Sequence, residues 1–260
     1  LTPAELIARA HTRGVTTLAL TDHDTTDGLA EAHAHARLKG IQFIPGVEIS
    51  TTWGGKTIHV VGLNVQAAAP ELVQGLARMR EIRRVRTEAI AHKLERAGVG
   101  GALAGVYAVA GAASSVSRTH FARLLVHRGH ARDTQQAFKK YLSNSGRAYV
   151  SVEWTSLPEA IACIRAAGGV AVVAHPGRYP YTHSTLRQLV GEFKELGGQA
   201  LEVMSGGHSR EDVKRIAQLA RDHDLYGSVG SDFHGPGNPQ AELGAQSRLV
   251  ENCKPVWELL

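Results

Sequence analysis

Histidines and acidic residues recur in short polar segments that follow predicted strands. His23 lies in one such segment, His175 ends a second strand, and Asp232 and His234 follow a third. In parallel α/β folds the carboxyl ends of the strands converge on one face, where function is built from separate segments. We therefore expect these side chains to point toward one place.

Two further candidates, Glu48 and His59, lie on the two arms of a predicted β-hairpin around Gly54 and Gly55, which permit a tight turn. A lone histidine beside an acid is ordinarily a surface residue. Imidazoles and carboxylates packed together from several segments, however, need a compensating cation. Mixed ligation of this kind suits Zn, Mn or Fe, and these segments lack the cysteines of a finger-type structural zinc site. The pattern predicts a site for divalent metal ions.

The elements that would position these side chains alternate between strand and helix. Thr2, Pro3 and Glu5 form a helix start with a capping box, and Ser156 with Glu159 forms another. The pattern predicts strands at residues 16–20, 41–44, 47–52, 57–65, 170–174, 200–203 and 225–229, and helices at 3–12, 29–39, 185–196 and 210–222. This alternation predicts an α/β body.

The middle of the chain differs in composition and in its predicted secondary structure. A long arginine-rich helix is predicted from residue 70 to 97, followed by shorter helices at 117–127 and 134–142, with no strand pattern. Between Glu71 and Arg147 there are fourteen lysines and arginines against five acids, a net charge of +9 in a chain whose net charge is +5. We expect a body of residues 1–66 and 149–260 interrupted by a basic, all-helical insertion at 67–148.

The composition describes a soluble globular protein of 260 residues with 43% hydrophobic residues and two cysteines. It excludes a disordered chain and a disulfide-stapled secreted domain. No apolar run is long enough to span a bilayer, and no signal peptide precedes Leu1. We expect a cytoplasmic protein with no membrane association and no obligate protein partner.

The segments that carry the candidate ligands resemble the metal motifs of the polymerase-and-histidinol-phosphatase (PHP) superfamily, which is related to the amidohydrolases. They are residues 21–25, 46–50, 58–62, 174–178 and 230–234. The resemblance implies a distorted (β/α)7 TIM-like barrel that in the complete protein holds up to three divalent ions, Mn first, with Fe and Zn as alternatives. By motif, the implied ligands are His23, Glu48, His59, His175, Asp232 and His234.

The basic insertion, with segments 117–123 and 138–142, is similar to one branch of this superfamily, the bacterial ribonuclease AM and nucleoside 3′,5′-bisphosphate phosphatase branch. The resemblance implies hydrolysis of the 3′ phosphoester of a 5′-phosphorylated nucleotide. A nucleoside 3′,5′-bisphosphate would give a 5′-monophosphate and phosphate. A short 5′-phosphorylated RNA would be trimmed in the 5′–3′ direction.

Several residues are expected to act on this substrate. Arg178 directly follows a ligand motif and could grip a phosphate bidentately, although a solvated loop arginine is the alternative. We assign catalysis to His175, Asp232 and Arg178, with water activated at the divalent ions. The pattern does not decide which histidine protonates the leaving oxygen.

The insertion and a few aromatic residues provide further candidates for substrate binding. Arg118, His120 and Lys140 are expected to bind the remote 5′-phosphate, with an exposed helix surface as the alternative. The arginines of the long helix, including Arg83 and Arg86, could equally form a solvated face. Aromatic residues that could stack a base, or simply pack, are Trp53, Trp154, Tyr179 and Tyr181.

The sequence departs from the superfamily pattern at its start. Members begin with a strand that ends in His-x-His, followed by Asp-Gly, just before a segment like residues 1–6, and this chain begins at Leu1. We expect an omitted or cleaved segment, and incomplete metal binding in a molecule that begins there.

Two other functions remain open at this stage. One is a small-molecule phosphomonoesterase or an amidohydrolase-type hydrolase, which a compact barrel without a basic insertion would favour. The other is a nucleic-acid-binding module whose metal site has decayed. The six matched ligands argue against decay, whereas the absent first strand argues for it.

Overall fold

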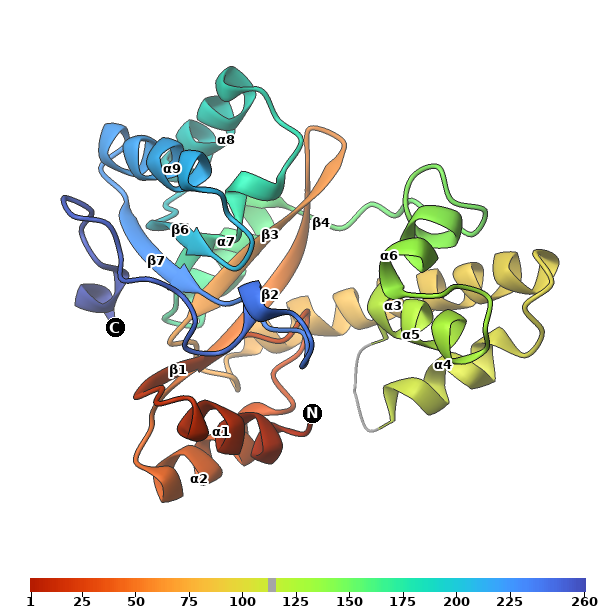
Figure 1. Ribbon diagram of the computed structural model, residues 1–260. Helices are drawn as coiled ribbons and strands as arrows, with labels where there is room; N and C mark the ends of the chain where they lie inside the picture. Colours follow the sequence, from red (N-terminus) through yellow and green to blue (C-terminus); the bar gives the residue numbers. More distant parts are fainter. Residues whose placement is uncertain (112–115) are drawn as a thin grey trace. The chain divides into compact units, whose positions relative to one another are not determined.

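The chain folds into two compact units (Figure 1). The computed structural model describes residues 1–111 and 116–260. Leu1–Gly75 and Thr155–Leu260 form the first unit, called here the sheet unit, and Leu76–Trp154 form the second, the helical unit. Helix α3 (Pro70–Arg96) begins in the sheet unit and continues into the helical unit.

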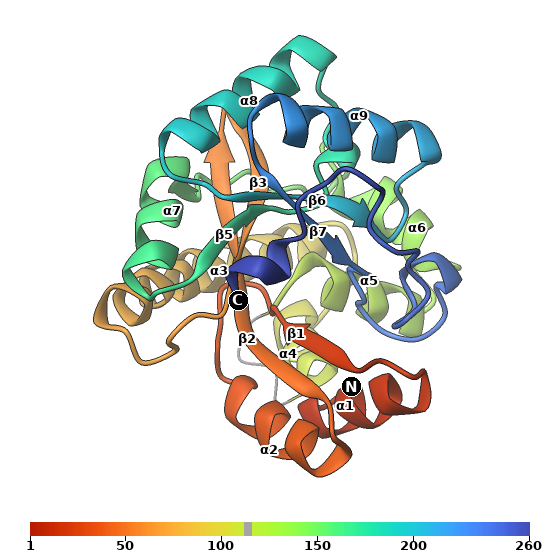
Figure 2. The same ribbon diagram turned by 90° about the vertical axis from the view of Figure 1, so that its left-hand side faces the viewer.

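The sheet unit is built on a curled, mixed sheet of seven strands (Figure 2). The strands are β1 (Thr17–Leu20), β2 (Gln42–Trp53), β3 (Lys56–Leu63), β4 (Thr155–Ser156), β5 (Val170–Val173), β6 (Ala200–Ser205) and β7 (Tyr226–Gly230). Their order is β1-β2-β3-β5-β6-β7, and β4 pairs with β2. Strand β3 is antiparallel to both of its neighbours, whereas the other pairings are parallel. The carboxyl ends of β1, β5 and β7 therefore lie at the same edge.

Helices and short turns of helix complete the sheet unit. They are α1 (Pro3–Thr12), α2 (Leu29–Lys39), α7 (Leu157–Ala166), η2 (Pro176–Arg178), α8 (His183–Glu195), α9 (Arg210–Asp222), η3 (Pro239–Ala241) and η4 (Val256–Leu259). The two predicted capping boxes are confirmed: Thr2 pairs with Glu5 at the start of α1, and Ser156 with Glu159 at the start of α7. Each box satisfies backbone groups that the first turn of a helix leaves unpaired.

Strand β2 differs from its prediction. Two separate strands were expected at residues 41–44 and 47–52, with Pro45 and Gly46 between them. The structure has one continuous strand of 12 residues. A Cβ at Gly46 would lie 2.7 Å from Thr21 Cγ2 and 2.9 Å from Gly62 O, so the glycine permits close passage between two neighbouring segments. The long strand carries Glu48 in its middle and extends the hairpin beyond it.

The core of the sheet unit lies between the sheet and its helices. Ile7 and Ala10 of α1 pack with Ala32 and Ala36 of α2 in one cluster that also includes Leu20 of β1. Helix α2 also contacts β2, and Leu20 of β1 and Phe43 of β2 belong to or pack against this cluster.

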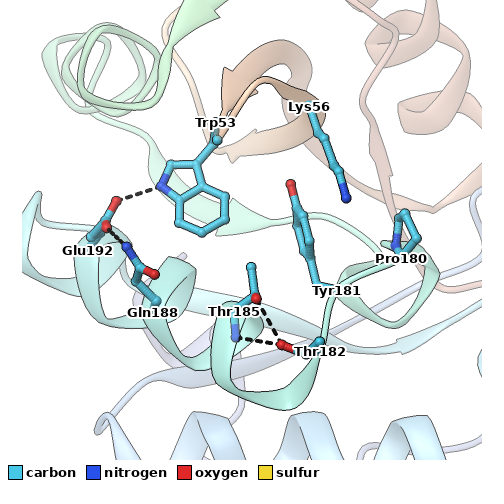
Figure 3. Close-up of a pocket in the computed structure, with 9 residues that line it drawn as sticks. Trp53, Lys56, Pro180, Tyr181, Thr182, Thr185, Gln188 and Glu192 are labelled. Atoms are coloured by element: carbon cyan, nitrogen blue, oxygen red, sulfur yellow. Dashed lines mark hydrogen bonds between the residues drawn. The ribbon is translucent and has the colours of Figure 1, made fainter.

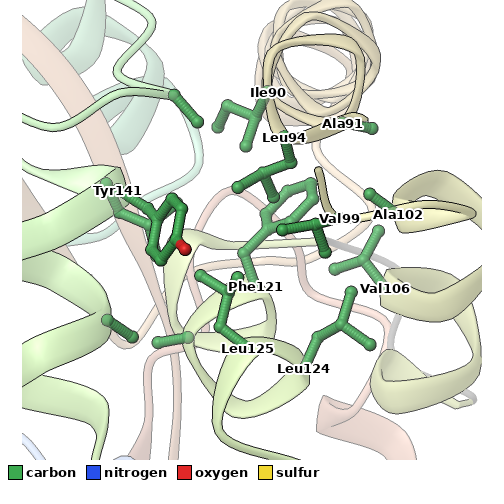
Figure 4. Packing of buried hydrophobic residues seen from close by; sticks show 14 of the residues in the cluster. Ile90, Ala91, Leu94, Val99, Ala102, Val106, Phe121, Leu124, Leu125 and Tyr141 are labelled. Atoms are coloured by element: carbon green, nitrogen blue, oxygen red, sulfur yellow. The ribbon is translucent and has the colours of Figure 1, made fainter. Parts of the chain in front are cut away.

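The helical unit has a core of its own. Its elements are the second part of α3, α4 (Ala102–Ala110), α5 (Arg118–His127), α6 (Thr134–Ala137) and the π-helical turn η1 (Phe138–Leu142). Leu94, Val99, Phe121 and Leu125 lie at the centre of this cluster (Figure 4). Helix α4 was not predicted, since its sequence of alanine, glycine, valine, leucine and tyrosine lacks a charged face. The single helix predicted at 134–142 is α6 followed by η1.

We expect Phe121→Ala to destabilise the helical unit by about 3–5 kcal/mol, because it removes a fully buried aromatic ring and leaves a cavity. Tyr107→Ala is the matched control, since Tyr107 of α4 is 46% exposed, and its effect should stay within about 0.5 kcal/mol. Denaturant unfolding measures both. Equal effects of the two variants would contradict the assigned core.

Candidate metal centre

A carboxylate enclosed by imidazoles lies at the strand-end edge of the sheet unit. Possible ligand atoms of His23, Glu48 and His59 all lie within 4.8 Å of one another. Glu48 Oε1 is 3.2 Å from His59 Nδ1 and 3.1 Å from His175 Nε2, and Glu48 Oε2 is 3.4 Å from His23 Nδ1. Four of the six predicted ligands therefore meet at the Glu48 carboxylate.

Each of these four side chains comes from a different part of the sheet. Glu48 lies in β2 and His59 in β3, while His23 follows β1 and His175 follows β5. His23 and Glu48 form a parallel β-bridge, in which Asp24 N donates to Glu48 O at 2.9 Å. The buried Asp24 carboxylate then accepts a bond of 2.7 Å from Ser50 N. This backbone pairing therefore sets the distance between His23 and Glu48 independently of any contact that their side chains make.

Three residues of the site have left-handed backbone conformations. The φ angle is +54° at Asp24, +31° at His175 and +52° at Asp232. Such conformations are uncommon outside glycine and cluster at functional sites, where the surrounding structure holds them. Here they coincide with the points where the chain leaves β1, β5 and β7.

Charge pairing dominates the titration of this group. Burial would raise the pKa of Glu48, but His23 and His59, together with the His175 hydrogen bond, outweigh burial and hold this pKa well below its usual value. Burial lowers and Glu48 raises the pKa of His175, and the net effect is an increase. The carboxylate therefore stays ionised and attracts positive charge.

The donors fit a divalent cation. His175 Nδ1 is buried, and no hydrogen-bond partner for it occurs among the residues that the structure describes. A buried carboxylate and several imidazole nitrogens are the donor set that Zn, Mn and Fe accept. His23, Glu48, His59 and His175 would hold such an ion.

The remaining two predicted ligands lie beside this group. The His234 ring is 5.8 Å from the His23 ring, and His234 Nδ1 is 3.5 Å from Asp232 Oδ1. Arg178, predicted to bind substrate, donates Nη1 to the Asp232 carboxylate and Nη2 to the carbonyl of Gly206. Its guanidinium is thus held at the edge of the cluster by a predicted metal ligand.

Two supporting residues were missed by the sequence analysis. Glu202 of β6 accepts the backbone N–H of His175 at 2.5 Å, and burial raises its pKa to about 7. His208 Nε2 accepts the N–H of Gly177 at 3.2 Å, so it positions the turn that carries Arg178. Glu202 could have been predicted as a functional residue, because it is an acidic residue in the otherwise apolar predicted strand at 200–203.

Tyr179, considered at first for base stacking, has a structural role beside the cluster. Its hydroxyl accepts the backbone N–H of His59 and donates to the carbonyl of Ala174, both at 2.9 Å. Its ring meets the His175 ring edge-on at 5.5 Å. Tyr179 therefore ties β3 to the end of β5 and fixes two of the imidazoles.

The helical unit contains a second charged group, a guanidinium cluster of Arg83, Arg86 and Arg118. Arg83 is buried, and the guanidinium carbons of Arg83 and Arg86 lie 5.1 and 5.2 Å from the ring centroid of Trp154. Burial, with Arg118 and Arg83 adding to it, lowers the pKa of Arg86 to about 10. The alternative of a solvated face is wrong for Arg83. Like charges packed this closely favour an anion between them.

The other residues predicted to bind substrate have different surroundings. Ser117 N donates to His120 Nδ1 at 3.0 Å within a capping box at the start of α5, next to Arg118. Lys140 is exposed; it donates to His130 O at 3.4 Å and lies 5.0 Å from the ring centroid of Tyr141.

Strand-end imidazoles and carboxylates around one point of a curled α/β sheet define a metal-binding α/β protein. The chain belongs to the PHP domain family, whose model matches residues 1–205. The resemblance stated from the motifs is therefore confirmed. The structure describes no helix that combines the length and the apolar character needed to cross a membrane.

Relatives with assigned names match nearly the whole chain. It is 45% identical over 260 residues to a 3′,5′-nucleoside bisphosphate phosphatase of Chromobacterium violaceum, covering 100% of this chain and 91% of the relative. It is 44% identical over 258 residues to a 5′-3′ exoribonuclease of Haemophilus influenzae, covering 99% and 93%. A solved structure of an amidohydrolase from Chromobacterium violaceum, with bound sulfate and no metal, superposes with a TM-score of 0.95 at 45% identity, covering 100% of this chain and 90% of that one.

We expect Glu48→Gln to weaken divalent-metal binding by at least about tenfold. The substitution removes the negative charge of the carboxylate that lies among the three imidazoles. Competition with a chromophoric chelator and elemental analysis of the purified protein measure the affinity and the number of ions. Glu195→Gln, on the exposed end of α8, is the matched control. Unchanged metal affinity in Glu48→Gln would remove Glu48 from the centre.

Proposed function

We propose that this protein is a metal-dependent phosphoesterase that hydrolyses the 3′ phosphoester of 5′-phosphorylated nucleotides. The observation that carries the proposal is the meeting of three imidazoles at the buried Glu48 carboxylate. The names of the two relatives, a nucleoside bisphosphate phosphatase and an exoribonuclease, support the same chemistry. Both activities break a bond between phosphorus and a 3′ oxygen.

The proposed reaction is a hydrolysis. The oxygen of water adds to phosphorus, the bond from phosphorus to O3′ breaks, and O3′ takes up a proton. A nucleoside 3′,5′-bisphosphate gives a nucleoside 5′-monophosphate and inorganic phosphate, and a short 5′-phosphorylated RNA loses one 5′-mononucleotide from its 5′ end. Divalent ions, of which we propose Mn first, would polarise the phosphoester and activate water when bound.

The side chains of the sheet unit have distinct proposed roles. His23, Glu48, His59 and His175 hold the metal, together with Asp232 and His234. Asp232 holds Arg178 at the edge of this group. When substrate binds, the Arg178 guanidinium leaves Asp232 and donates to a non-bridging oxygen of the phosphate. Glu202 is a positioning residue, because it holds the backbone of His175 rather than a reacting atom.

The guanidinium cluster of the helical unit is the proposed binding site for the remote 5′-phosphate. Arg83 and Arg86 lie against Trp154, and the Arg118 guanidinium carbon lies 5.9 Å from the Phe138 ring centroid. Stacking holds these planar groups in place, and a phosphate dianion would relieve their repulsion with short charge-assisted hydrogen bonds. His120 and Lys140 are proposed as further contacts.

The architecture proposed for this activity is the distorted (β/α)7 barrel of the PHP type, formed by residues 1–66 and 149–260, with 67–148 as an inserted helical subdomain. The parallel pairing of β5, β6 and β7, with α8 and α9 between successive strands, supports it.

We expect Asp232→Asn to lower kcat for both substrates at least about tenfold, because it removes the charge of a proposed ligand while keeping its shape. Phosphate release from adenosine 3′,5′-bisphosphate and mononucleotide release from short 5′-phosphorylated RNA are the measurements, made on the metal-loaded chain. An Asp232→Asn variant with full activity on either substrate would contradict the catalytic assignment.

We expect Arg118→Gln to reduce kcat/KM for a nucleoside 3′,5′-bisphosphate by about 10- to 100-fold, the scale of one lost hydrogen bond to a charged group. Hydrolysis of a nucleoside 3′-monophosphate, which lacks the 5′-phosphate, should change little. Arg123→Gln, an exposed arginine on the same helix α5, is the control. Equal losses on both substrates would show that Arg118 does not read the 5′-phosphate.

A further inference from the structure

A cavity of about 550 Å³ opens at the tip of the β2–β3 hairpin, within the sheet unit. Figure 3 shows Tyr181 between Trp53 and Lys56, with Thr182 and Thr185 at the start of α8 beneath them. Its volume lies in the usual range for sites that bind small ligands or parts of larger ones. Trp53 and Tyr181 were considered at first for base stacking, and neither the metal centre nor the guanidinium cluster uses this cavity.

Two aromatic rings form a fixed angular wall. The Trp53 and Tyr181 rings meet edge-on, with centroids 5.6 Å apart and an interplanar angle of 81°. Trp53 Nε1 donates to Glu192 Oε2 at 2.5 Å, and Gln188 Nε2 donates to the other oxygen of this carboxylate at 2.8 Å. The indole is thus held in place, and the negative charge of Glu192 is already engaged by two donors. A rigid aromatic platform of this kind suits the flat face of a base.

Polar atoms are also available in the cavity. Lys56 Nζ lies 5.1 Å from the centroid of the Tyr181 ring. The Tyr181 hydroxyl is buried, and no hydrogen-bond partner for it occurs in the described part of the chain. Leaving such a group unpaired costs about 1–3 kcal/mol, so a ligand or water that pairs with it is favoured. An ammonium, a phenol and aromatic faces together match the phosphate, the sugar and the base of a nucleotide.

The cavity is connected to the metal centre through two aromatic contacts. The Tyr181 ring lies 5.7 Å from the Tyr179 ring, which in turn lies 5.5 Å from the His175 ring. Along β3, Lys56 precedes His59 by three residues, about 10 Å of extended strand, and this odd spacing directs the two side chains to opposite faces of the strand. Strand β5 pairs with β3 only from Val60 onward, so a nucleotide chain leaving the metal centre would reach the cavity around the free edge of β3. A bisphosphate could not, because it ends at the phosphate that is hydrolysed.

We propose that this cavity binds the nucleotide on the 3′ side of the hydrolysed phosphoester, with its base on the Trp53–Tyr181 wall and its phosphate near Lys56. The inference rests on the proposed phosphoesterase function and extends it, since it makes an RNA chain a ligand of the hairpin tip. It separates the two substrates: RNA uses the cavity, whereas the bisphosphate uses only the metal centre and the guanidinium cluster.

The test compares one RNA and one bisphosphate on matched variants of the metal-loaded chain. Trp53→Ala should raise KM for a 5′-phosphorylated RNA tetranucleotide about 5-fold or more, the lower end of the effect of losing one stacked base. KM for adenosine 3′,5′-bisphosphate should stay within about twofold. Trp53→Phe should recover most of the RNA affinity. Trp257→Ala, a 54% exposed tryptophan of η4, is the control and should change neither KM.

A binding measurement separates failure of this inference from failure of the proposed activity. The ligand is the same tetranucleotide with its first linkage replaced by a non-hydrolysable methylene phosphonate, and its Kd is compared between the wild-type chain and the Trp53→Ala and Tyr181→Phe variants. Tyr181→Phe keeps the ring and removes only the unpaired hydroxyl. Weaker binding in both variants supports the cavity as the site. Equal Kd values in all three proteins would overturn the inference, whether or not the RNA is hydrolysed.

Discussion

A buried carboxylate among three imidazoles is the constraint on which the site depends. Glu48 is 6% exposed, and an ionised group at such a position is costly unless positive charge compensates it. A cation held jointly by the carboxylate and the imidazoles would supply that charge. This arrangement requires His23, His59 and His175 to lie close to the two Glu48 oxygens, and their nitrogens lie 3.1 to 3.4 Å from these oxygens. The backbone pairing of β1, β2 and β3 meets this requirement.

The division of the chain into two units separates two kinds of electrostatic site. In the sheet unit, the Glu48 carboxylate lies among three imidazoles. In the helical unit, the guanidinium groups of Arg83 and Arg86 stack on the Trp154 ring. Each unit has its own hydrophobic core, so neither charged group depends on the other for its local geometry. Arginine suits the second site because its planar, weakly hydrated head can be buried against Trp154 while its charge remains.

Helices were predicted well where the residues that stabilise them lie within the helix or at its ends. The predicted bounds of α1, α2, α3 and α9 agree with the structure within a residue or two, and a capping box predicted the start of α7, because capping and hydrophobic periodicity act over a single helical turn. The continuity of β2 through Pro45 and Gly46 could not be predicted in the same way. It results from strands on either side, since β1 pairs with the first part of β2 and β3 with the rest. Helix α4 was missed because its helical state depends on packing rather than on an amphipathic pattern.

The sequence by itself determined which residue types follow the strand ends, and hence the donors available for metal and phosphate. Their chemistry is a property of each side chain and of its distance from a strand end. The tertiary structure decided the contacts: Arg178 with Asp232, Glu202 with the backbone of His175, Arg83 and Arg86 with Trp154, and Trp53 with Tyr181. These pairs lie far apart along the chain, and no local pattern encodes them, because each contact exists only once the sheet has curled and the helices have packed. The physical reason is that the fold as a whole creates both the burial that lowers the pKa of Arg86 and the hydrogen bond that holds the Trp53 ring.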